Sequence, residues 1–377
     1  MSDTAADARL IIAASETDAD LYYATGFLAP DAFIFLQTPS EKILLMSDLE
    51  LDRARSQAQV DTVLAISHYQ EKAKADGLEH PSSLDALHQL LQERRVKALQ
   101  VPRTFPIHAA DTLRSAGYSV TFPEGSFFSQ RECKTPEEIA HIRDVQRCTE
   151  TAMDAAVNAI RSAGIQDGTL YQSSDPLTSE TVKRLIGRTL MDRDCTASHT
   201  IVACGDQACD PHNEGTGPLR AGQPIIIDIF PRSNRTGYFA DITRTVVKGA
   251  PTDAMRDLYN TVLESQTRAL AHIRAGVDGQ EVHRQVTDLF ESKNYQTGEI
   301  DGRMQGYFHG TGHGVGLEIH ESPRISKASN TLRPGHVVTV EPGLYYPGRG
   351  AVRIEDLVVV TETGCENLTA YPKGFEL

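Results

Sequence analysis

The sequence predicts a two-domain protein of the mixed α/β class, and three observations support this prediction. The chain has 377 residues, which is long enough for two domains that each bury a core. In its first third, short apolar runs alternate with helical patterns, as they do in an α/β domain. The later part contains two segments of similar layout, each with an apolar strand, a turn and a returning strand. We therefore expect a smaller domain over residues 1–130 and a larger domain over residues 131–377.

The first domain is predicted to alternate strands and helices. The apolar runs LIIAA, AFIFLQ and KILLMS predict strands, and the turn PSE pairs the last two. Apolar residues at helical spacing separate the later strands. The expected strands cover residues 10–14, 32–37, 42–47, 62–66 and 98–101, and the expected helices cover residues 18–24, 48–58, 83–95 and 107–116.

The boundary between the domains is predicted near residues 123–134, PEGSFFSQRECK, and a helix follows it. Thr135 can cap this helix, Pro136 fits its first position, and Glu138 completes a capping box. Apolar residues then recur on one helical face, so the helix is expected to run until Gly164. Further helices are expected over residues 178–190 and after Asp253 and Asp278.

Charge and composition limit the molecules that the protein is expected to bind and the compartment in which it is expected to work. The formal net charge of −14 argues against nucleic acid and anionic membranes. No apolar stretch approaches the roughly 20 residues that a membrane helix needs. In residues 1–14 an acidic start precedes a short apolar run, which does not fit a secretory signal. The 6 cysteines form no CxxC pair and are typical of free thiols in a reducing compartment. We expect a cytoplasmic protein.

Carboxylates in the two repeated segments are candidate metal ligands. PIIIDIF and GYFADITRTVVKG carry Asp228 and Asp241, while HVVTVEPGL and AVRIEDLVVVTETG carry Glu341 and Glu355. Facing antiparallel strands can bring such side chains together among buried Ile, Val and Leu. A buried carboxylate without a partner is costly or becomes protonated, and a bound cation removes that penalty. One such residue alone is more often a strand-end acid that faces water, but the repeated arrangement favours metal ligands.

The segment HGTGHGVGLEIHE supplies histidines between the two carboxylate segments. Its glycines prevent a regular helix and let the backbone approach a ligand closely. His313 is therefore a candidate nitrogen ligand, and His309 and His320 lie on either side of it in the sequence. The pattern differs from the HExxH helix of single-zinc peptidases.

These motifs together resemble the pita-bread metallopeptidases, the superfamily of methionine aminopeptidase, aminopeptidase P and prolidase. HGTGHGVGLEIHE, TVEPGLYY, VRIEDLVVVT and GYFADITRT carry the resemblance, which covers residues 134–377. DADLYYATGF, in the first domain, resembles the N-terminal domain of the creatinase/prolidase branch, which methionine aminopeptidases generally lack. The resemblance implies a pita-bread fold with two related αβ halves, preceded by a smaller α/β domain of the creatinase/prolidase type.

The resemblance also implies a set of metal ligands. Asp228 corresponds to the two-oxygen ligand of one metal. Asp241 and Glu355 correspond to carboxylates that bridge both metals. His313 and Glu341 complete the shell of the other metal.

Three histidines match substrate contacts of the family. His212, in DPHNEG, occupies the position of a substrate-contacting histidine. His320 matches a histidine that hydrogen-bonds the scissile carbonyl or the intermediate. His309 is a third candidate for substrate binding.

Two arginines and one departure from the family pattern complete the comparison. Arg353 precedes Glu355 by two residues, so strand alternation would put both on one face, where Arg353 could brace a ligand carboxylate. Arg244 is left to a structural role. The family usually has Asp-x-Gly at the first ligand, whereas Phe230 replaces that glycine here and PRSNRTGYFA lengthens the segment between the aspartates.

The implied activity is hydrolysis of Xaa-Pro bonds by a bridging hydroxide that two divalent metals activate. The oxygen-rich site favours Mn²⁺, with Co²⁺ or Zn²⁺ as alternatives. Glu341 would carry the proton, and His320 would stabilise the oxyanion with His212 and Arg353 in supporting catalytic roles. The substrate would be a short peptide with proline in the second position, and the assembly a homodimer.

Several functions stay open at this point. Aminopeptidase P and prolidase activities are not separated by the sequence. A creatinase-like C–N hydrolase and a non-enzymatic pita-bread binding protein are the alternatives. The family's creatinases work without metal and its binding proteins typically lose metal ligands, so the retained ligand set favours the peptidase.

Overall fold

A computed structural model describes residues 6–377. The first five residues, which open the segment considered above for a secretory signal, lie outside the described residues. The chain divides into two compact units, Met1–Ser129 and Gln130–Leu377. The predicted mixed α/β class is confirmed. Within residues 6–377, no helix combines the length and the apolar composition needed to cross a membrane.

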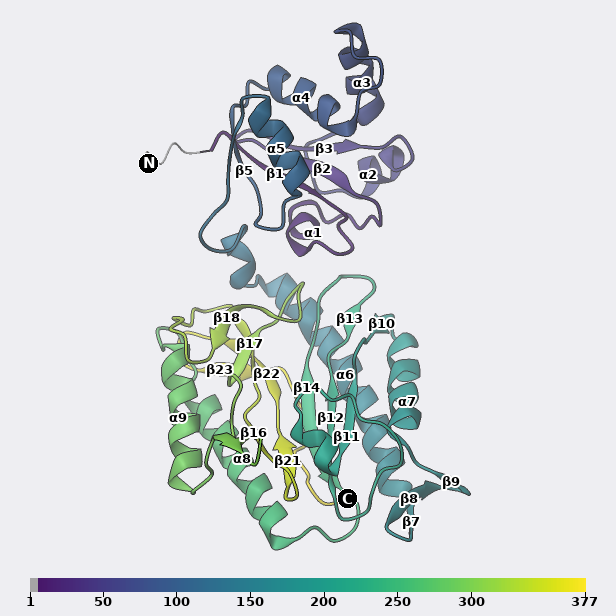
Figure 1. Cartoon of the computed structure of the whole chain (residues 1–377), viewed down its shortest axis with the longest axis vertical. Coiled ribbons are helices and arrows are strands. Elements are labelled where there is room, and N and C mark those ends of the chain that lie inside the picture. Colours follow the sequence, from purple (N-terminus) through teal and green to yellow (C-terminus); the bar gives the residue numbers. More distant parts are fainter. Residues whose placement is uncertain (1–5) are drawn as a thin grey trace. The chain divides into compact units, whose positions relative to one another are not determined.

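The first unit is built on one six-stranded sheet with the strand order β4-β3-β2-β1-β5-β6. Strands β1, β2 and β3 are antiparallel neighbours, whereas β4, β5 and β6 join the sheet in parallel. The strands are β1 (Ala8–Ala13), β2 (Phe33–Gln37), β3 (Lys42–Met46), β4 (Thr62–Ala65), β5 (Ala98–Gln100) and β6 (Ser119–Thr121). The helices are α1 (Ala19–Thr25), α2 (Leu51–Gln57), α3 (Ile66–Ala75), α4 (Ser83–Glu93) and α5 (Ile107–Ser115) (Figure 1).

Both faces of this sheet are buried because apolar residues fill both sides of its central strands. In β2, Ile34 and Leu36 join one core, while Phe33 and Phe35 join the other. This follows from the alternation of side chains along a strand. Helices α4 and α5 contribute to the first core, and α1 and α2 contribute to the second.

The second unit begins with the helix that the capping box predicts, α6 (Pro136–Ser162). The Thr135 hydroxyl accepts a hydrogen bond from the Glu138 N–H, and the Glu138 carboxylate accepts one from the Thr135 N–H. The helix ends two residues before Gly164, the predicted end. The other predicted helices are α7 (Ser179–Met191), α8 (Asp253–His272) and α9 (Gly279–Ser292).

Two sheets, each with its own pair of helices, form the body of this unit. Helices α6 and α7 pack on the sheet β11-β12-β14, and α8 and α9 pack on the sheet β18-β17-β19-β22-β23 (Figure 1). The strands of the first sheet are β11 (Ile201–Cys204), β12 (Pro224–Ile229) and β14 (Ile242–Val247). Those of the second are β17 (Gly312–Gly314), β18 (Glu321–Ile325), β19 (Val337–Val340), β22 (Asp356–Val360) and β23 (Cys365–Asn367). These are the two αβ halves that the resemblance implies.

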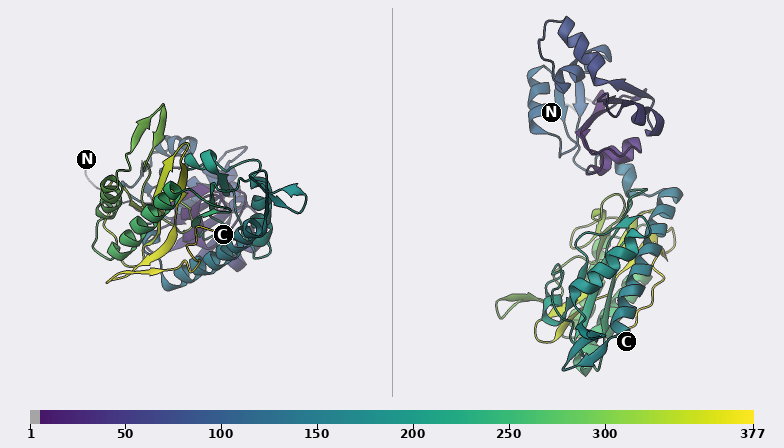
Figure 2. Two further views of the ribbon diagram at one scale, coloured as in Figure 1. Left: turned by 90° about the horizontal axis from the view of Figure 1, so that it is seen from below. Right: turned by 90° about the vertical axis from the view of Figure 1, so that its right-hand side faces the viewer.

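Short strands and two short helices make up the remaining elements. The hairpin of β15 (Gly298–Ile300) and β16 (Arg303–Gln305) projects from the unit (Figure 2). The other short elements are β7 (Gly164–Gln166), β8 (Thr169–Gln172), β9 (Asp175–Pro176), β10 (Cys195–Thr196), β13 (Arg232–Ser233), β20 (Gly343–Tyr346), β21 (Gly350–Arg353), and the 3-10 helices η1 (Ser129–Glu132) and η2 (Gly205–Cys209).

The two carboxylate segments are more elaborate than the predicted hairpins. Strands β12 and β14 pair as expected, but Asp228 lies opposite Thr243, and Asp241 directly precedes β14. Strands β19 and β22 also pair, yet the residues between them form a separate hairpin of β20 and β21. Each segment therefore leaves carboxylates at the end of its strand pair, where the chain changes direction.

Candidate metal centre

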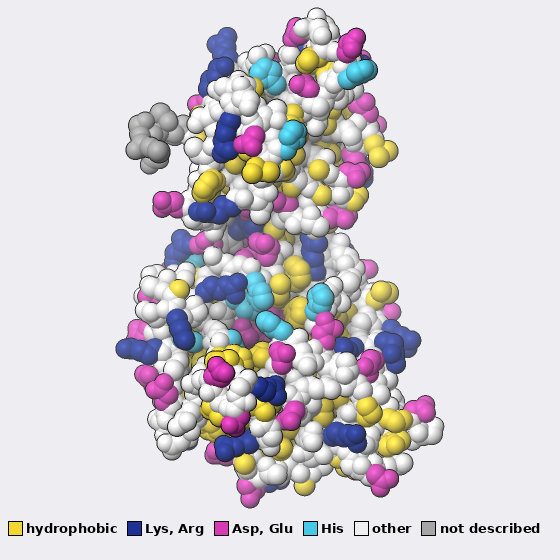
Figure 3. Space-filling view, in the orientation of Figure 1, with side chains coloured by type: hydrophobic (Ala, Val, Ile, Leu, Met, Phe, Trp, Pro, Cys, Tyr) yellow, Lys and Arg dark blue, Asp and Glu magenta, His cyan; other side chains and the backbone are white. Residues whose placement is uncertain are grey.

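A cavity of about 790 Å³ in the second unit brings all the predicted site residues together. Histidine side chains gather on one face of this unit in the space-filling view (Figure 3). The predicted residues that line the cavity are His212, Asp228, Asp241, His309, His313, His320, Glu341, Arg353 and Glu355. Residues separated by more than a hundred positions thus meet because both sheets end at this cavity.

The tightest cluster contains Asp241, His313 and Glu355, which are all buried. One candidate ligand atom from each lies within 4.8 Å of the others. Asp241 precedes β14, His313 is in the middle of β17, and Glu355 lies just before β22. Each half of the unit therefore supplies part of the cluster.

Asp228 and Glu341 line the same cavity but lie outside this group of three. Glu341 Oε1 is 3.5 Å from His313 Nε2, and Asp241 Oδ2 is 3.7 Å from the same nitrogen. Asp228 Oδ2 accepts a hydrogen bond from Arg353 Nη2 at 2.7 Å. All five candidate ligands thus border one space.

The expectation that Arg353 and Glu355 share one strand face is wrong. Strand β21 ends at Arg353 and β22 begins at Asp356, so Glu355 lies in the connection between two strands of different sheets. Arg353 does brace a candidate ligand, but that ligand is Asp228 from the other half.

Electrostatics at the cluster favour a bound cation. Burial, reinforced by the neighbouring carboxylates, raises the pKa of Asp241 and of Glu355 well above the usual range. Burial also raises the pKa of Glu341 to about 7. Among the described residues, Asp228 Oδ1 and Asp241 Oδ1 are buried without a hydrogen-bond partner. Divalent cations would both neutralise the repulsion and satisfy these oxygens, so the residues present fit a metal site.

His313 is suited to bind a metal as a neutral imidazole. Burial and the neighbouring His320 ring lower the pKa of His313 to about 3. Its Nδ1 lies 3.2 Å from the Gly314 carbonyl oxygen, which can only accept, so the proton sits on Nδ1. The lone pair on Nε2 then faces the carboxylates, as it does in metal-ligating histidines.

His309 is part of a hydrogen-bonded chain that reaches Asp228. Its Nδ1–H donates to the Gly310 carbonyl oxygen at 2.7 Å, and its Nε2 accepts from the Tyr345 hydroxyl at 2.9 Å. The Tyr345 oxygen accepts in turn from Arg353 Nη1 at 3.0 Å. Burial, with Arg353 nearby, lowers the pKa of His309 to about 3. Sequence reasoning did not single out Tyr345, although it lies within TVEPGLYY.

The other two histidines lie at the cavity without such a chain. The His320 ring stands edge-on to His313, with centroids 4.3 Å apart and planes at 86°. Burial lowers the pKa of His320. His212 lines the cavity together with Phe230 and Phe308, so the residue that replaces the usual glycine does form part of the pocket wall.

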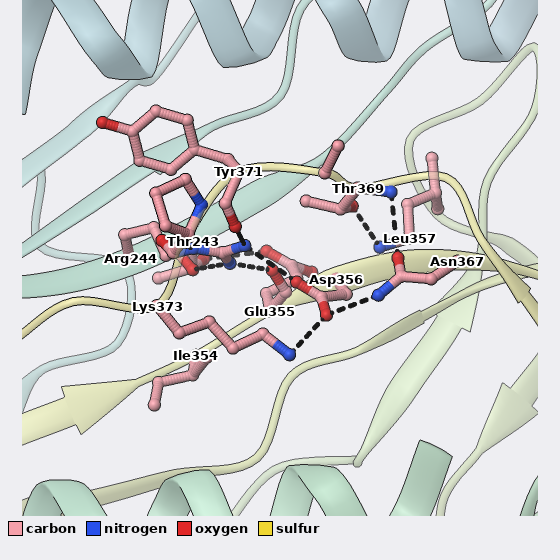
Figure 4. A network of polar contacts seen from close by, with 12 residues as sticks. Thr243, Arg244, Ile354, Glu355, Asp356, Leu357, Asn367, Thr369, Tyr371 and Lys373 are labelled. Atoms are coloured by element: carbon pink, nitrogen blue, oxygen red, sulfur yellow. Dashed lines mark hydrogen bonds and ion pairs between the residues drawn. The ribbon is translucent and has the colours of Figure 1, made fainter. Parts of the chain in front are cut away.

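Arg244 lies outside the cavity lining and is fully buried. It donates to the carbonyl oxygens of Thr243 and Glu355 and forms an ion pair of 2.9 Å with Asp356 (Figure 4). The Thr243 hydroxyl donates to Glu355 Oε2 at 2.8 Å. These contacts tie β14 to the segment that carries Glu355.

Residues 140–362 match the metallopeptidase family M24, and this range contains every residue of the candidate site. The chain belongs to this family. Membership in this metallopeptidase family implies that divalent metal ions are its cofactors.

Relatives among the curated proteins agree with the M24 assignment. The uncharacterized peptidase YqhT of Bacillus subtilis is 40% identical over 182 residues, which are 48% of this chain and 49% of that protein. The Xaa-Pro dipeptidase of Pyrococcus furiosus is 40% identical over 175 residues, 46% of this chain and 47% of that protein. The chain thus matches about half the length of these curated relatives.

Similarity to solved structures extends over both units. The X-Pro aminopeptidase of Thermotoga maritima aligns over 99% of this chain and 98% of that chain, with a TM-score of 0.82 and 26% identity. This likeness in fold covers nearly the whole chain, the first unit included.

Proposed function

We propose that this M24 protein is a dinuclear-metal peptidase that hydrolyses the bond before proline in short peptides. The observation that supports the proposal is the buried cluster of Asp241, His313 and Glu355, whose candidate ligand atoms lie within 4.8 Å of one another. Asp228 and Glu341 border the same cavity. One imidazole with several carboxylates suits a pair of divalent cations.

Each ligand has a proposed role. Asp241 and Glu355 would be shared by the two metals, Asp228 would hold one of them, and His313 and Glu341 would hold the other. The partnerless buried oxygens of Asp228 and Asp241 support this assignment among the described residues. We favour Mn²⁺ because the set is rich in oxygen, with Co²⁺ or Zn²⁺ as alternatives.

The remaining cavity residues supply orientation and proton transfer. When bound, the two metals would lower the pKa of a shared water and polarise the scissile carbonyl. Glu341, beside His313, carries a proton from water to the leaving proline nitrogen. His320 donates a hydrogen bond to the oxyanion, and His212 contacts the substrate. Arg353 holds Asp228 in place through its 2.7 Å hydrogen bond.

The cavity and the named relatives support the proposed substrate class. A cavity of about 790 Å³ is in the range of small-ligand sites and suits a short peptide. Phe230 and Phe308 add apolar surface to the cavity lining, which fits a proline ring. The relatives include an Xaa-Pro dipeptidase and an X-Pro aminopeptidase, so the proposal leaves open which of these two kinds of Xaa-Pro hydrolysis the protein performs.

A substrate panel tests the proposal directly. Purified protein would be offered Xaa-Pro, Xaa-Pro-Yaa, matched Xaa-Ala peptides and creatine, each with Mn²⁺ and with a chelator. We expect cleavage of proline peptides that chelation abolishes, and the ratio of the first two rates assigns dipeptidase or aminopeptidase. Failure to cleave any proline peptide, with metal bound, would contradict the proposal. Creatine hydrolysis would favour the alternative C–N hydrolase, and a protein that takes up no Mn²⁺ and cleaves nothing would favour a binding protein.

Assembly is also a proposal. We propose a homodimer, because twofold dimers are the commonest soluble assemblies. Light scattering that shows a monomer at the assay concentration would contradict the dimer. The cytoplasmic location stays a prediction of the sequence.

A further inference from the structure

A buried ion cluster lies in the second unit, outside the lining of the cavity. Its members are Arg131, Lys134 and Glu321, whose side chains are 11%, 1% and 8% exposed. Lys134 Nζ contacts Glu321 Oε1, and Arg131 Nη2 donates to Glu321 Oε2 at 2.9 Å. Burying such charges gives little net stability, because desolvation offsets their attraction. The cluster therefore suggests a role beyond stability.

The Glu321 carboxylate closes the loop that carries His320. Glu321 opens β18 and lies opposite Gly314 of β17, so the loop begins and ends at this pair. Glu321 Oε2 also lies 3.4 Å from the Glu318 N–H. At Gly316 an added Cβ would lie 2.4 Å from Glu321 Oε1, so glycine leaves the space that the carboxylate occupies. The loop is folded around this carboxylate.

His320 depends on that loop for its position. Within residues 6–377 its imidazole makes no hydrogen bond, and its ring contact is the edge-on one with His313 at 4.3 Å. A ring without a hydrogen bond of its own is placed by its backbone. The backbone next to His320 is that of Glu321, which the two cations hold.

We propose that Lys134 and Arg131 are positioning residues, which fix Glu321 and, through it, the place of His320 in the cavity. This inference rests on the proposed peptidase function, because the catalytic role of His320 is itself part of that proposal. The cations come from the segment that precedes α6, and Lys134 is 187 residues from Glu321 in the sequence. The start of the second unit thus contributes to the site without touching the substrate.

The test compares full-length variants with Mn²⁺ on an Xaa-Pro peptide. Lys134→Met and Glu321→Leu remove the contact, whereas Glu321→Gln keeps its shape and one acceptor oxygen. A misplaced catalytic group costs about a hundredfold, so we expect kcat to fall by about that factor in the first two variants, with KM and bound metal close to wild type. Glu321→Gln should lose about tenfold or less. Arg147→Met, at an exposed ion pair of α6, is the matched control and should leave kcat unchanged.

A second readout follows the His320 ring without using activity. In protein labelled with ¹³C at histidine Cε1, the His320 resonance should move in Lys134→Met and stay in place in Arg147→Met. An unchanged resonance and an unchanged kcat in Lys134→Met would overturn the positioning role. If that variant does not fold, Glu321→Leu takes its place, and wild-type values of both readouts there would overturn the role equally.

The two readouts also separate this inference from the proposed function. A wild-type protein that binds metal but cleaves no proline peptide would contradict the peptidase proposal. The resonance of His320 would still decide whether Lys134 holds the loop.

Discussion

Replacement of Arg244 by methionine tests whether the buried network behind the site holds the two halves of the second unit together. The Arg244 side chain is 2% exposed and that of Asp356 is 0% exposed. Arg244 also donates to the carbonyl oxygen of Glu355, which lies just before β22 of the other half, and to those of Tyr371 and Pro372 in the segment after β23 (Figure 4). The substitution Arg244→Met leaves these acceptors and Asp356 without that donor.

The expected loss can be worked out from this geometry. Removing one partner of a buried ion pair typically costs about 3–5 kcal/mol. Asp356 retains Lys373 at 2.6 Å and the Asn367 amide at 2.8 Å, so we expect the lower end, about 3 kcal/mol. For a unit of this size each kcal/mol shifts Tm by about 2–4 °C, which predicts a decrease of about 6–12 °C.

Calorimetry on the full chain would measure this decrease. Arg147→Met removes an exposed arginine from a surface ion pair and should change Tm by no more than about 1–2 °C. The double variant Arg244→Met/Asp356→Asn should lose less stability than the sum of the two single losses, because both substitutions remove the same ion pair. A single variant with the wild-type Tm, or a double variant whose loss is the sum of both single losses, would refute the reasoning.

Three further predictions concern the site and pH. Chelation should abolish cleavage, and added Mn²⁺ or Co²⁺ should restore it. Folded Asp241→Ala or Glu355→Ala protein should be inactive. Near-normal rates in either variant would disprove the two-metal assignment. His313→Ala should lose both metal and rate, whereas His320→Ala should keep its metal, measured by elemental analysis, and lose about a hundred- to a thousandfold in rate; the opposite pattern would exchange their roles. Burial lowers the pKa of His336 to about 4, so the unfolded chain binds more protons below about pH 6.5. The contribution of His336 to the free energy of unfolding should be fully present above that pH and should decrease toward pH 4. The substitution His336→Leu should therefore flatten the slope of the unfolding free energy against pH. An unchanged slope would contradict this.

Local sequence signals predicted the elements whose causes are local. The capping box of Thr135 and Glu138 placed the start of α6, because each of its hydrogen bonds spans three residues. Helix α3 was missed, since its sequence ISHYQEKAKA is largely polar and buries only Tyr69 and Ala73. Without an apolar stripe, that helix has no periodic signal for sequence analysis to detect.

At the site, the sequence predicted which residues line the cavity but not which side chains contact one another. The motifs around His313 and Glu341 identified residues that do line one cavity. The partner of Arg353 was not predictable from strand alternation, because β21 ends at that residue and its carboxylate comes from β12. The ion cluster of Lys134 and Glu321 was missed for the same reason: its members are 187 positions apart, and no periodic pattern joins them.

The candidate metal centre lies at the joint, which is the place where the two halves of the second unit meet. Asp241 comes from the first half, while His313 and Glu355 come from the second, so neither half holds a complete ligand cluster. The Glu355 N–H donates to the Thr243 carbonyl oxygen at 3.0 Å, and the Thr243 hydroxyl donates to Glu355 Oε2 at 2.8 Å. Any ligand that binds only the assembled cluster must therefore stabilise the joint as well, by mass action. Contacts at this joint, such as those of Arg244, act on the site through the backbone of Glu355, even though the arginine lies outside the cavity lining.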